Sequence, residues 1–346
     1  MKQFFLTTLS LFFMLFATAQ TTDVQLATLQ HGDKTTIFSG PDAFVAAYNA
    51  AADSLDIITL SSGIFNAPGT ISKQIRVYGA GYTTDTITGT KPTIISGSGS
   101  IILKHRDTVN EDGYDVKAGI KVDNSYFEGL HLDYHVDLYD NTLEIKNVTF
   151  KRCNVGNVRI YTSTENVNFI NCVVRGSYYG YGSGDYKHNN LYITNGSFSN
   201  LYSGFAGSIY IDHCVCKSVS SAAYVQNSVI LNSLVSSSIS ESNIFVKSIP
   251  SDVTQNKESW ANVPLQSIFV EGTYENDKWL NDGGSILKYP NKYIGNDGTQ
   301  VGLYGGLYPF GRIPSTPRIV ESSIDTKTSA DGKLKVSIKA EAQTKD

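Results

Sequence analysis

A short pattern decides the fold of this chain, and its clearest copy reads NFINCVV at residues 168–174. The same pattern returns on both sides, as EIKNVTF at 144–150, YITNGSF at 192–198, YIDHCVC at 210–216 and, more loosely, ILNSLVS at 230–236. Asn147, Asn171 and Asn195 lie 24 residues apart, and the later copies follow at steps of 18 and 20 residues. Repeats of about 20 residues that consist of short β-rich runs are typical of a solenoid.

Each copy has apolar residues two apart on both sides of a polar position, as expected for two short strands that meet at a bend. β-Branched and aromatic residues dominate, which favours strands over helices. Asn tolerates the left-handed backbone of such a bend. Stacking the copies therefore predicts a ladder of Asn147, Asn171 and Asn195 at about 4.8 Å spacing. It also predicts an inward column that contains Phe150, Val174 and Phe198.

The four cysteines are predicted to be free, although an even number of cysteines favours disulfides in an exported protein. The stacking separates Cys172 from Cys214 by two coils, roughly 9–10 Å at the strand spacing, which is too far for a disulfide. Cys214 and Cys216 share one strand face, where their parallel side chains also disfavour a bond. We expect these residues and Cys153 to be small buried hydrophobes.

The first twenty residues have the features of a secretory signal peptide. They read MKQFFLTTLSLFFMLFATAQ, in which an apolar stretch of 13 residues from Phe4 to Phe16 precedes the small-x-small sequence Ala17-Thr18-Ala19. The apolar stretch is shorter than the ~20 residues of a membrane span. Residues 1–19 are therefore predicted to be a signal peptide. The exported chain is expected in the periplasm, at the cell surface or in the medium, without a membrane span.

The composition excludes several classes of protein. The 346 residues include 28 basic and 32 acidic side chains, which give a formal net charge of −4. A hydrophobic fraction of 41% with only 17% charged residues excludes a disordered chain. Without an excess of basic residues, the chain is not expected to bind nucleic acid through phosphate contacts.

The Asn ladder within short β coils resembles the right-handed parallel β-helix superfamily, whose fold is called pectate-lyase-like. Other segments fit this resemblance: Pro41–Ala51 is similar to the helix that caps such solenoids, and Asp56–Phe65 and Ile75–Gly81 look like the first two strands. Gly295–Gly306 is similar to the closing segment of secreted bacterial β-helix proteins. The resemblance implies an all-β fold, a single-stranded right-handed parallel β-helix with an N-terminal capping helix and a C-terminal β tail.

These features divide the exported chain into two parts. The β-helix is expected to span residues 20–313, with its N-terminal cap at about 35–60 and regular coils at about 126–248. In the remaining residues 314–346, two strand-like runs, Arg318–Val320 and Leu334–Lys339, are joined by a turn. This pattern predicts a β-hairpin tail that packs on or beyond the last coil.

One candidate for chemistry is the sequence HLDYHVD at residues 131–137. Strict alternation places His131, Asp133, His135 and Asp137 on one face of a strand. These side chains are suited to a metal site, with Asp133 and Asp137 as ligands, or to an acid–base pair. The alternative is a solvated strand face without a ligand, because side chains about 6.6 Å apart must lean together to share one ion.

A row of tyrosines is predicted to lie beside this strand. Counting forward from the ladder places the following residues in successive coils: Arg159 and Tyr161, then Tyr179 and Tyr181, then Tyr202, then Tyr224. Aromatic rings suit sugars, which present an apolar face to the ring and hydroxyls to its polar tip. Candidate substrate-binding residues are therefore Tyr161, Tyr179, Tyr181 and Tyr202. The alternative is that some of these rings stack inward in the core.

Two functions remain open on these grounds. The first is an exported protein that binds extracellular or cell-envelope polysaccharide without catalysis. The second is a polysaccharide lyase or glycoside hydrolase that acts on an acidic glycan, with His135, Asp137 and Arg159 as catalytic candidates. For a lyase, the resemblance implies an Arg base and an acidic Ca²⁺ cluster, for which Asp133 and Asp137 are the candidates.

The sequence around these residues favours binding over catalysis. The segment that flanks Arg159 does not match the lyase motif, and the Asn-Thr-Asp, Gly-His-Gly and Arg-Ile-Lys blocks of polygalacturonases are missing. We expect no cofactor apart from Ca²⁺ in the case of a lyase. The expected partner is a polysaccharide, and the expected oligomeric state is a monomer.

Overall fold

The computed structural model describes most of the chain after the predicted signal peptide. The described residues are 24–52, 55–97, 100–109, 115–140, 143–181, 186–202, 207–219, 224–230, 240–241, 243–245, 256–257, 259–260, 262–270, 285–314, 317–325, 327–333 and 335–341. The signal peptide and most of the loose repeat copy at 230–236 lie outside these ranges.

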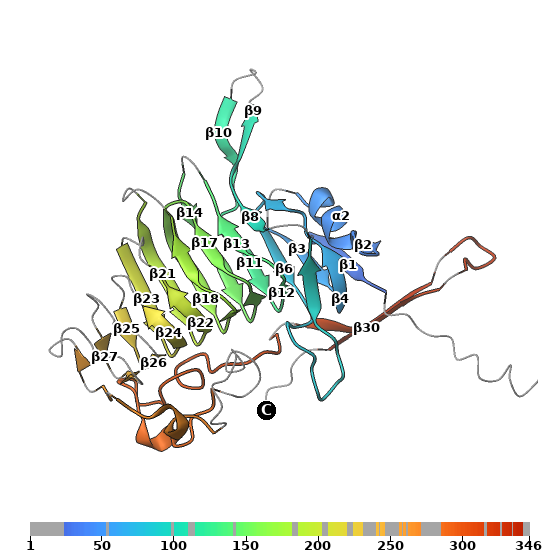
Figure 1. Cartoon of the computed structure of the whole chain (residues 1–346). Helices are drawn as coiled ribbons and strands as arrows, with labels where there is room; N and C mark the ends of the chain where they lie inside the picture. Colours follow the sequence, from blue (N-terminus) through green and yellow to red (C-terminus); the bar gives the residue numbers. More distant parts are fainter. Residues whose placement is uncertain are drawn as a thin grey trace, which may run out of the picture.

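Two large sheets run along the molecule (Figure 1). In the first, sheet A, β1 pairs in antiparallel fashion with β2 and β3, and every later neighbour pairs in parallel. Its strands are, in spatial order, β2 (Lys34–Ser39), β1 (Leu26–His31), β3 (Asp56–Leu60), β6 (Ile75–Tyr78), β11 (Tyr126–Glu128), β15 (Thr149–Lys151), β18 (Thr164–Ile170), β21 (His188–Thr194), β23 (Gly207–Asp212), β25 (Tyr224–Gln226), β27 (Ser240–Glu241) and β29 (Asn256–Lys257), with β14 (Ile145–Lys146) also paired to β18.

The second sheet, sheet B, is parallel throughout and has two arms that meet at β22 (Ser197–Leu201). The first arm contains β4 (Gly63–Asn66), β7 (Thr93–Ser96), β12 (His131–Leu132), β16 (Asn154–Val155) and β19 (Val173–Val174), and beyond β22 it continues through β24 (Val215–Val219), β26 (Val229–Ile230) and β28 (Ile244–Phe245). The second arm contains β5 (Thr70–Ile71), β8 (Ile101–Leu103), β13 (Val136–Leu138), β17 (Val158–Ile160) and β20 (Tyr178–Gly180).

The chain winds through these three surfaces in turn. After β15 in sheet A it forms β16 in the first arm and β17 in the second, and it then returns as β18 beside β15. The protein is thus mainly β, and its large parallel sheets are consistent with the predicted solenoid. An antiparallel hairpin of β9 (Arg106–Val109) and β10 (Asp115–Ile120) projects from the stack (Figure 1).

Stacked aromatic rings fill the interior. The ring centroids of Phe127 and Phe150 lie 4.8 Å apart, and those of Phe150 and Phe169 lie 5.2 Å apart, with interplanar angles of 12° and 4°. Each ring is completely buried, which contributes roughly 1.5–3 kcal/mol per side chain. The predicted inward column is correct for Val174 and Phe198, which are register partners, but Phe150 pairs with Phe169 instead.

All four cysteines are buried and free, as predicted. The Cys172 thiol donates to the backbone carbonyl of Phe150 at 3.4 Å, and the Cys214 thiol donates to that of Ile193 at 3.2 Å. Burial raises the pKa of Cys214 to about 12, so this thiol stays protonated at neutral pH. The cysteines therefore serve as small core residues.

Residues with left-handed backbone form two columns along the stack, and not one. The corner between sheet A and the first arm contains a column of residues with φ between 48° and 71°: Gly129, Arg152, Asn171, Asn195, His213 and Asn227. We call these six residues the corner column. A second ladder consists of Asn124, Asn147, Asn166 and Asn190, in which each amide donates to the preceding one at 3.0 to 3.1 Å.

The predicted ladder of Asn147, Asn171 and Asn195 is therefore wrong for Asn147, which stacks on Asn124 and Asn166. Asn171 and Asn195 do occupy adjacent coils, since the backbone N–H of Asn171 donates to Thr194 beside Asn195. Both columns require a residue that tolerates positive φ, and Asn meets this need in each. The constant spacing between Asn residues thus connected two different columns, one at the corner before the first arm and one within sheet A.

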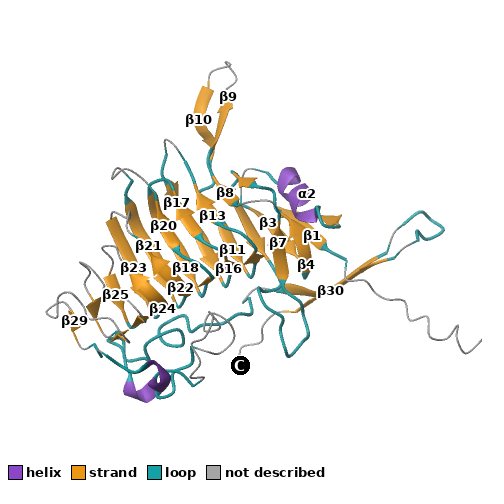
Figure 2. Ribbon diagram, in the orientation of Figure 1, coloured by secondary structure: helices purple, strands orange, loops and turns teal. Residues whose placement is uncertain are grey.

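The N-terminal end of the stack is capped by α2 (Ala43–Ala50), as the sequence predicted (Figure 2). Ala43, Phe44, Ala47 and Tyr48 form its buried face. The ammonium group of Lys73 donates to the backbone carbonyls of Tyr48 at 2.9 Å and Ala51 at 2.5 Å. A cation at this position complements the partial negative charge of a helix C-terminus.

The C-terminal part of the chain runs back along the corner column from the last coils to the first (Figure 1). The backbone N–H of Asn296 donates to the side-chain oxygen of Asn227, Asn195 donates to the carbonyls of Leu303 and Gly305, and Pro314 packs directly on Gly129. Apolar residues of the same segment, including Tyr293 and Val301, cover the outer face of the first arm at Val215 and Val229. We call residues 285–314 the cover segment.

The hairpin tail is present, but its predicted position on or beyond the last coil is wrong. It consists of β30 (Arg318–Ile324) and β31 (Val336–Glu341), which pair in antiparallel fashion. Arg318 forms a buried ion pair with Asp85, and the Ser322 hydroxyl donates to the carbonyl of Val24 at 2.8 Å. Because the cover segment leads back along the stack, the tail docks at the N-terminal end.

Candidate functional site

Five tyrosines form a continuous patch on the outer face of the second arm. β13, β17 and β20 are neighbours in that arm (Figure 2), and parallel pairing places Asp137, Arg159 and Tyr179 side by side. Two columns result: Tyr179 and Tyr202 in one, and three further rings in the other, namely Tyr139, Tyr161 and Tyr181. We call these five residues the tyrosine strip.

The rings of the strip contact one another both along and across the columns. The centroids of Tyr161 and Tyr181 lie 4.5 Å apart and those of Tyr179 and Tyr202 lie 4.9 Å apart, both nearly parallel. Tyr181 also lies 5.9 Å from Tyr179, which joins the columns. The exposed fractions of Tyr139, Tyr181 and Tyr202 are 37%, 42% and 43%. The alternative that these rings stack inward therefore holds for Tyr178, which is buried, and not for the strip.

An Arg–Asp pair stands at the side of the strip. The Nε and Nη2 atoms of Arg159 donate to the two carboxylate oxygens of Asp137, each at 2.6 Å, and Nη2 also donates to the Ser100 hydroxyl at 2.6 Å. The guanidinium carbon lies 5.9 Å from the centroid of Tyr161. The hydrogen bonds that Arg159 donates to Asp137 raise the pKa of Arg159, so the guanidinium remains protonated. Planar bidentate pairing also fixes its orientation.

The single strand predicted over residues 131–137 is two strands. β12 ends at Leu132, β13 begins at Val136, and the residues between them turn from the first arm into the second. His131 therefore lies on the outer face of the first arm, where its Nε2 accepts from Arg175 Nη1 at 2.9 Å and lies 3.2 Å from Asp133 Oδ1. Asp137 lies on the second arm and faces Arg159. The four side chains do not share one face.

His135 occupies the turn between these strands. Its Nδ1 accepts from the backbone N–H of Asn157 at 3.2 Å. Burial and then the charge of Arg159 lower the pKa of His135, so the imidazole is neutral at pH 7 with its proton on Nε2. The ring borders a small hollow with Tyr134, Leu132 and Ile101, whose cavity volume is only about 10 Å³. A typical small-molecule pocket has roughly 300–1,000 Å³, so this hollow is too small to hold a sugar.

The structure brings some candidate residues together and separates others. Tyr161, Tyr179, Tyr181 and Tyr202 are adjacent, with Asp137 and Arg159 beside them, whereas Asp133 and His135 lie at the turn. Tyr224 belongs to sheet A, where it stacks on Tyr210 at 5.1 Å, so its predicted place in the row is wrong. Within the described ranges, no three His, Cys, Asp or Glu side chains gather closely enough to hold a metal ion.

Sequence reasoning missed Tyr139, which completes the strip. It follows Asp137 by two residues, just as Tyr161 follows Arg159 and Tyr181 follows Tyr179. Side chains two apart on a strand share a face, so this spacing carried the signal. The ammonium group of Lys104 lies 5.5 Å from the Tyr139 centroid and marks this end of the strip.

Three comparisons with known proteins complete the description of the site. No protein-family model, no curated protein and no solved structure matches this chain. In the part of the chain that the structure describes, no helix combines the length and apolar character needed to cross a membrane. The fold and the strip themselves are therefore the basis for assigning a function.

Proposed function

We propose that this protein is an exported right-handed parallel β-helix of pectate-lyase-like architecture that binds extracellular or cell-envelope polysaccharide without catalysis. The observation that carries the proposal is the tyrosine strip, in which five partly exposed rings from four coils form one surface. A contiguous exposed aromatic surface on a soluble protein marks an interaction site. Tyrosine combines an apolar ring with a polar hydroxyl, as a sugar surface requires.

The repeat of the strip suits a polymer better than a small molecule. Neighbouring strands are about 4.8 Å apart, so equivalent tyrosines recur at this interval along the stack. That interval is similar to the length of one pyranose unit in an extended glycan. A chain that lies along the strip would therefore place successive sugars against successive coils. The surface is open, whereas small ligands favour enclosed pockets.

The polar groups beside the strip support binding more than catalysis. A base must have a free lone pair, but the lone pair of neutral His135 accepts a hydrogen bond from Asn157. Arg159 is held protonated by Asp137, and both oxygens of that carboxylate are engaged by Arg159. The three candidate catalytic residues thus bind their neighbours.

Retention on immobilised polysaccharides tests the proposal. The chain purified after export is applied to neutral and acidic polysaccharides with and without Ca²⁺, and the release of reducing or unsaturated ends is recorded in parallel. We expect retention without product. Tyr181→Ala should weaken retention about tenfold, because this ring contacts both Tyr161 and Tyr179. Tyr210→Ala is the matched control, since Tyr210 stacks on Tyr192 at 4.9 Å on sheet A.

Two outcomes would contradict the proposal. Equal loss in Tyr181→Ala and Tyr210→Ala would mean that retention does not depend on the strip. Release of product that is lost in His135→Ala or Arg159→Ala would identify a polysaccharide lyase or glycoside hydrolase instead. A requirement for Ca²⁺ that is removed by Asp133→Asn or Asp137→Asn would support the lyase and its predicted metal ligands.

A further inference from the structure

The charges beside the strip carry an inference about the class of glycan, which rests on the proposed function. We propose that the strip selects uncharged polysaccharides, and that Arg159 determines this selectivity because Asp137 cancels its charge and leaves its outer N–H groups free to donate. The alternative ligand, an acidic glycan, is the class that a solitary arginine would favour.

The hydrogen bonds of Arg159 divide its donors into two sets. A guanidinium has five N–H groups, of which Nε carries one and each Nη carries two. Nε and Nη2 are used by Asp137 and Ser100. Nη1 has no hydrogen-bond partner among the described residues. The side chain is 28% exposed, so part of the guanidinium is within reach of a ligand on the strip.

The position of Asp137 makes this pair close to neutral for an approaching ligand. Its side chain is only 10% exposed, and both of its oxygens lie 2.6 Å from Arg159 nitrogens. A ligand carboxylate at Nη1 would gain attraction from Arg159, but the charge of Asp137 on the other side of the guanidinium would offset part of it. It would also lose water without full compensation.

An uncharged sugar avoids these costs. A hydroxyl or amide carbonyl oxygen can accept from Nη1 while the pair with Asp137 stays intact, and a bond from a charged donor is stronger than one between neutral groups. Arg159 lies beside Tyr161, so a sugar packed on that ring would be within reach of Nη1. Lys104 lies at the Tyr139 end, beyond the pair, and it provides a control for general positive charge.

The test compares polymers that differ only in charge. Each neutral polysaccharide of the panel is paired with the same polymer oxidised at C6 to the uronic acid, and dissociation constants are measured by affinity electrophoresis at low and high salt. The wild-type protein should bind the neutral form at least tenfold more tightly. Asp137→Asn, which keeps the shape but exposes the charge of Arg159, should tighten binding of the acidic form about tenfold at low salt, and high salt should remove this gain.

Variants of Arg159 and Lys104 separate the role of general positive charge from that of the hydrogen-bond donor Nη1. Arg159→Met should weaken binding of the neutral polymer about tenfold, because it keeps the apolar stem and removes Nη1. Lys104→Gln should change the preference between the two forms by less than about twofold, because Lys104 lies outside the pair. Circular dichroism melting of each variant checks that the fold is retained.

Failure of the proposed function and failure of the proposed selectivity would give different results. If no polymer is retained, the proposed function and the selectivity are both wrong. If the oxidised polymers bind the wild-type protein as well as the neutral ones, or better, the selectivity is wrong while the proposed function stands. If Asp137→Asn leaves the binding of the acidic form unchanged, the assignment of the neutralising role to Asp137 is overturned.

Discussion

The corner column and the tyrosine strip are products of the same repeat, yet the protein treats them differently. Asn195 and His213 in the corner column are completely buried under the cover segment. Tyr181 and Tyr202 in the strip remain more than 40% exposed. Any residue type that recurs once per coil forms a column at the strand spacing. Periodicity alone therefore does not identify a binding site. A binding site is identified by a column that the rest of the chain leaves exposed to solvent.

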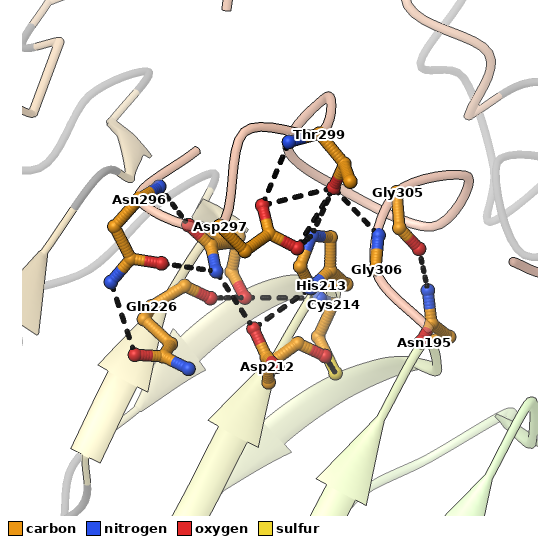
Figure 3. A network of polar contacts seen from close by, with 12 residues as sticks. Asn195, Asp212, His213, Cys214, Gln226, Asn296, Asp297, Thr299, Gly305 and Gly306 are labelled. Atoms are coloured by element: carbon orange, nitrogen blue, oxygen red, sulfur yellow. Dashed lines mark hydrogen bonds and ion pairs between the residues drawn. The ribbon is translucent and has the colours of Figure 1, made fainter. Parts of the chain in front are cut away.

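The contacts of the cover segment explain why the corner column is structural. His213 Nε2 lies 3.1 Å from the Thr299 hydroxyl and 3.3 Å from Asp297, while Nδ1 lies 2.8 Å from Asp212 (Figure 3). Gly306 approaches the ring so closely that a Cβ atom at that position would lie 2.9 Å from Nδ1. The corner column is thus the surface on which the C-terminal part of the same chain packs.

The largest effect on the free energy of unfolding is expected at the ion pair that anchors the hairpin tail to the N-terminal end of the stack. Arg318 donates to Asp85 and to the carbonyl of Ala80, and the two side chains of the ion pair are 8% and 4% exposed. Arg318→Leu leaves the Asp85 charge buried without its partner, which should reduce the free energy of unfolding by about 3–5 kcal/mol. Arg159→Leu also leaves Asp137 without its partner, but this pair is more exposed, so the cost should be smaller, about 1–3 kcal/mol. Urea denaturation of both variants checks the difference, and equal losses would contradict it.

Acid should weaken the same anchor. Burial raises the pKa of Asp85, but hydrogen bonds from Arg318, Ile87 and Thr88 outweigh burial and hold the pKa at about 2. A folded-state pKa below the ordinary value of 3.8 contributes stability that is complete above about pH 4. About 2 kcal/mol should therefore be lost as the pH falls from 4 to 2.

Urea denaturation at several pH values measures this loss. Asp85→Asn removes the titrating group and serves as the control, so its stability should fall less steeply over the same range. An identical slope in the variant and the wild type would assign the acid sensitivity to other carboxylates.

A smaller, local effect is expected in the middle of the cover segment. His213→Asn keeps a residue that tolerates the φ of 51° but is too short to reach Asp297 and Thr299 as the imidazole does. The loss of these contacts should favour local opening by about 1–2 kcal/mol. Hydrogen exchange at the N–H groups of Gly302 and Gly306 should then be about tenfold faster, with unchanged exchange at β17.

The sequence was sufficient for features that depend on neighbours along the chain. Alternation around each bend predicted the short strands, the free cysteines followed from their column positions, and the i, i+2 spacing placed Tyr179 and Tyr181 on one face. It was insufficient where two positions in a coil have the same physical requirement. Asn147 and Asn171 both tolerate positive φ, so the sequence could not tell which of the two columns each one joins.

Contacts between residues far apart in the sequence were the other feature that could not be predicted. Nothing local to Arg318 indicates that its partner is Asp85, 233 residues earlier in the chain. The tail was therefore expected at the last coil, next to the residues that precede it in sequence. For the same reason the covering of the corner column by residues 285–314 could not be predicted, and with it the contrast between covered and open surfaces.

The smallest change in stability is expected in the strip itself. Tyr181 is 42% exposed and stacks on Tyr161 outside the core, so Tyr181→Ala should lower the free energy of unfolding by only about 0.5–1 kcal/mol. The same substitution is expected to weaken polysaccharide retention about tenfold. A binding surface should show this combination, because its rings are kept for contact with a ligand and not for packing. Thermal melting and retention measured on one preparation decide the matter. A loss of more than 2 kcal/mol together with unchanged retention would mean that the strip is an outer support for the second arm, equivalent to the corner column.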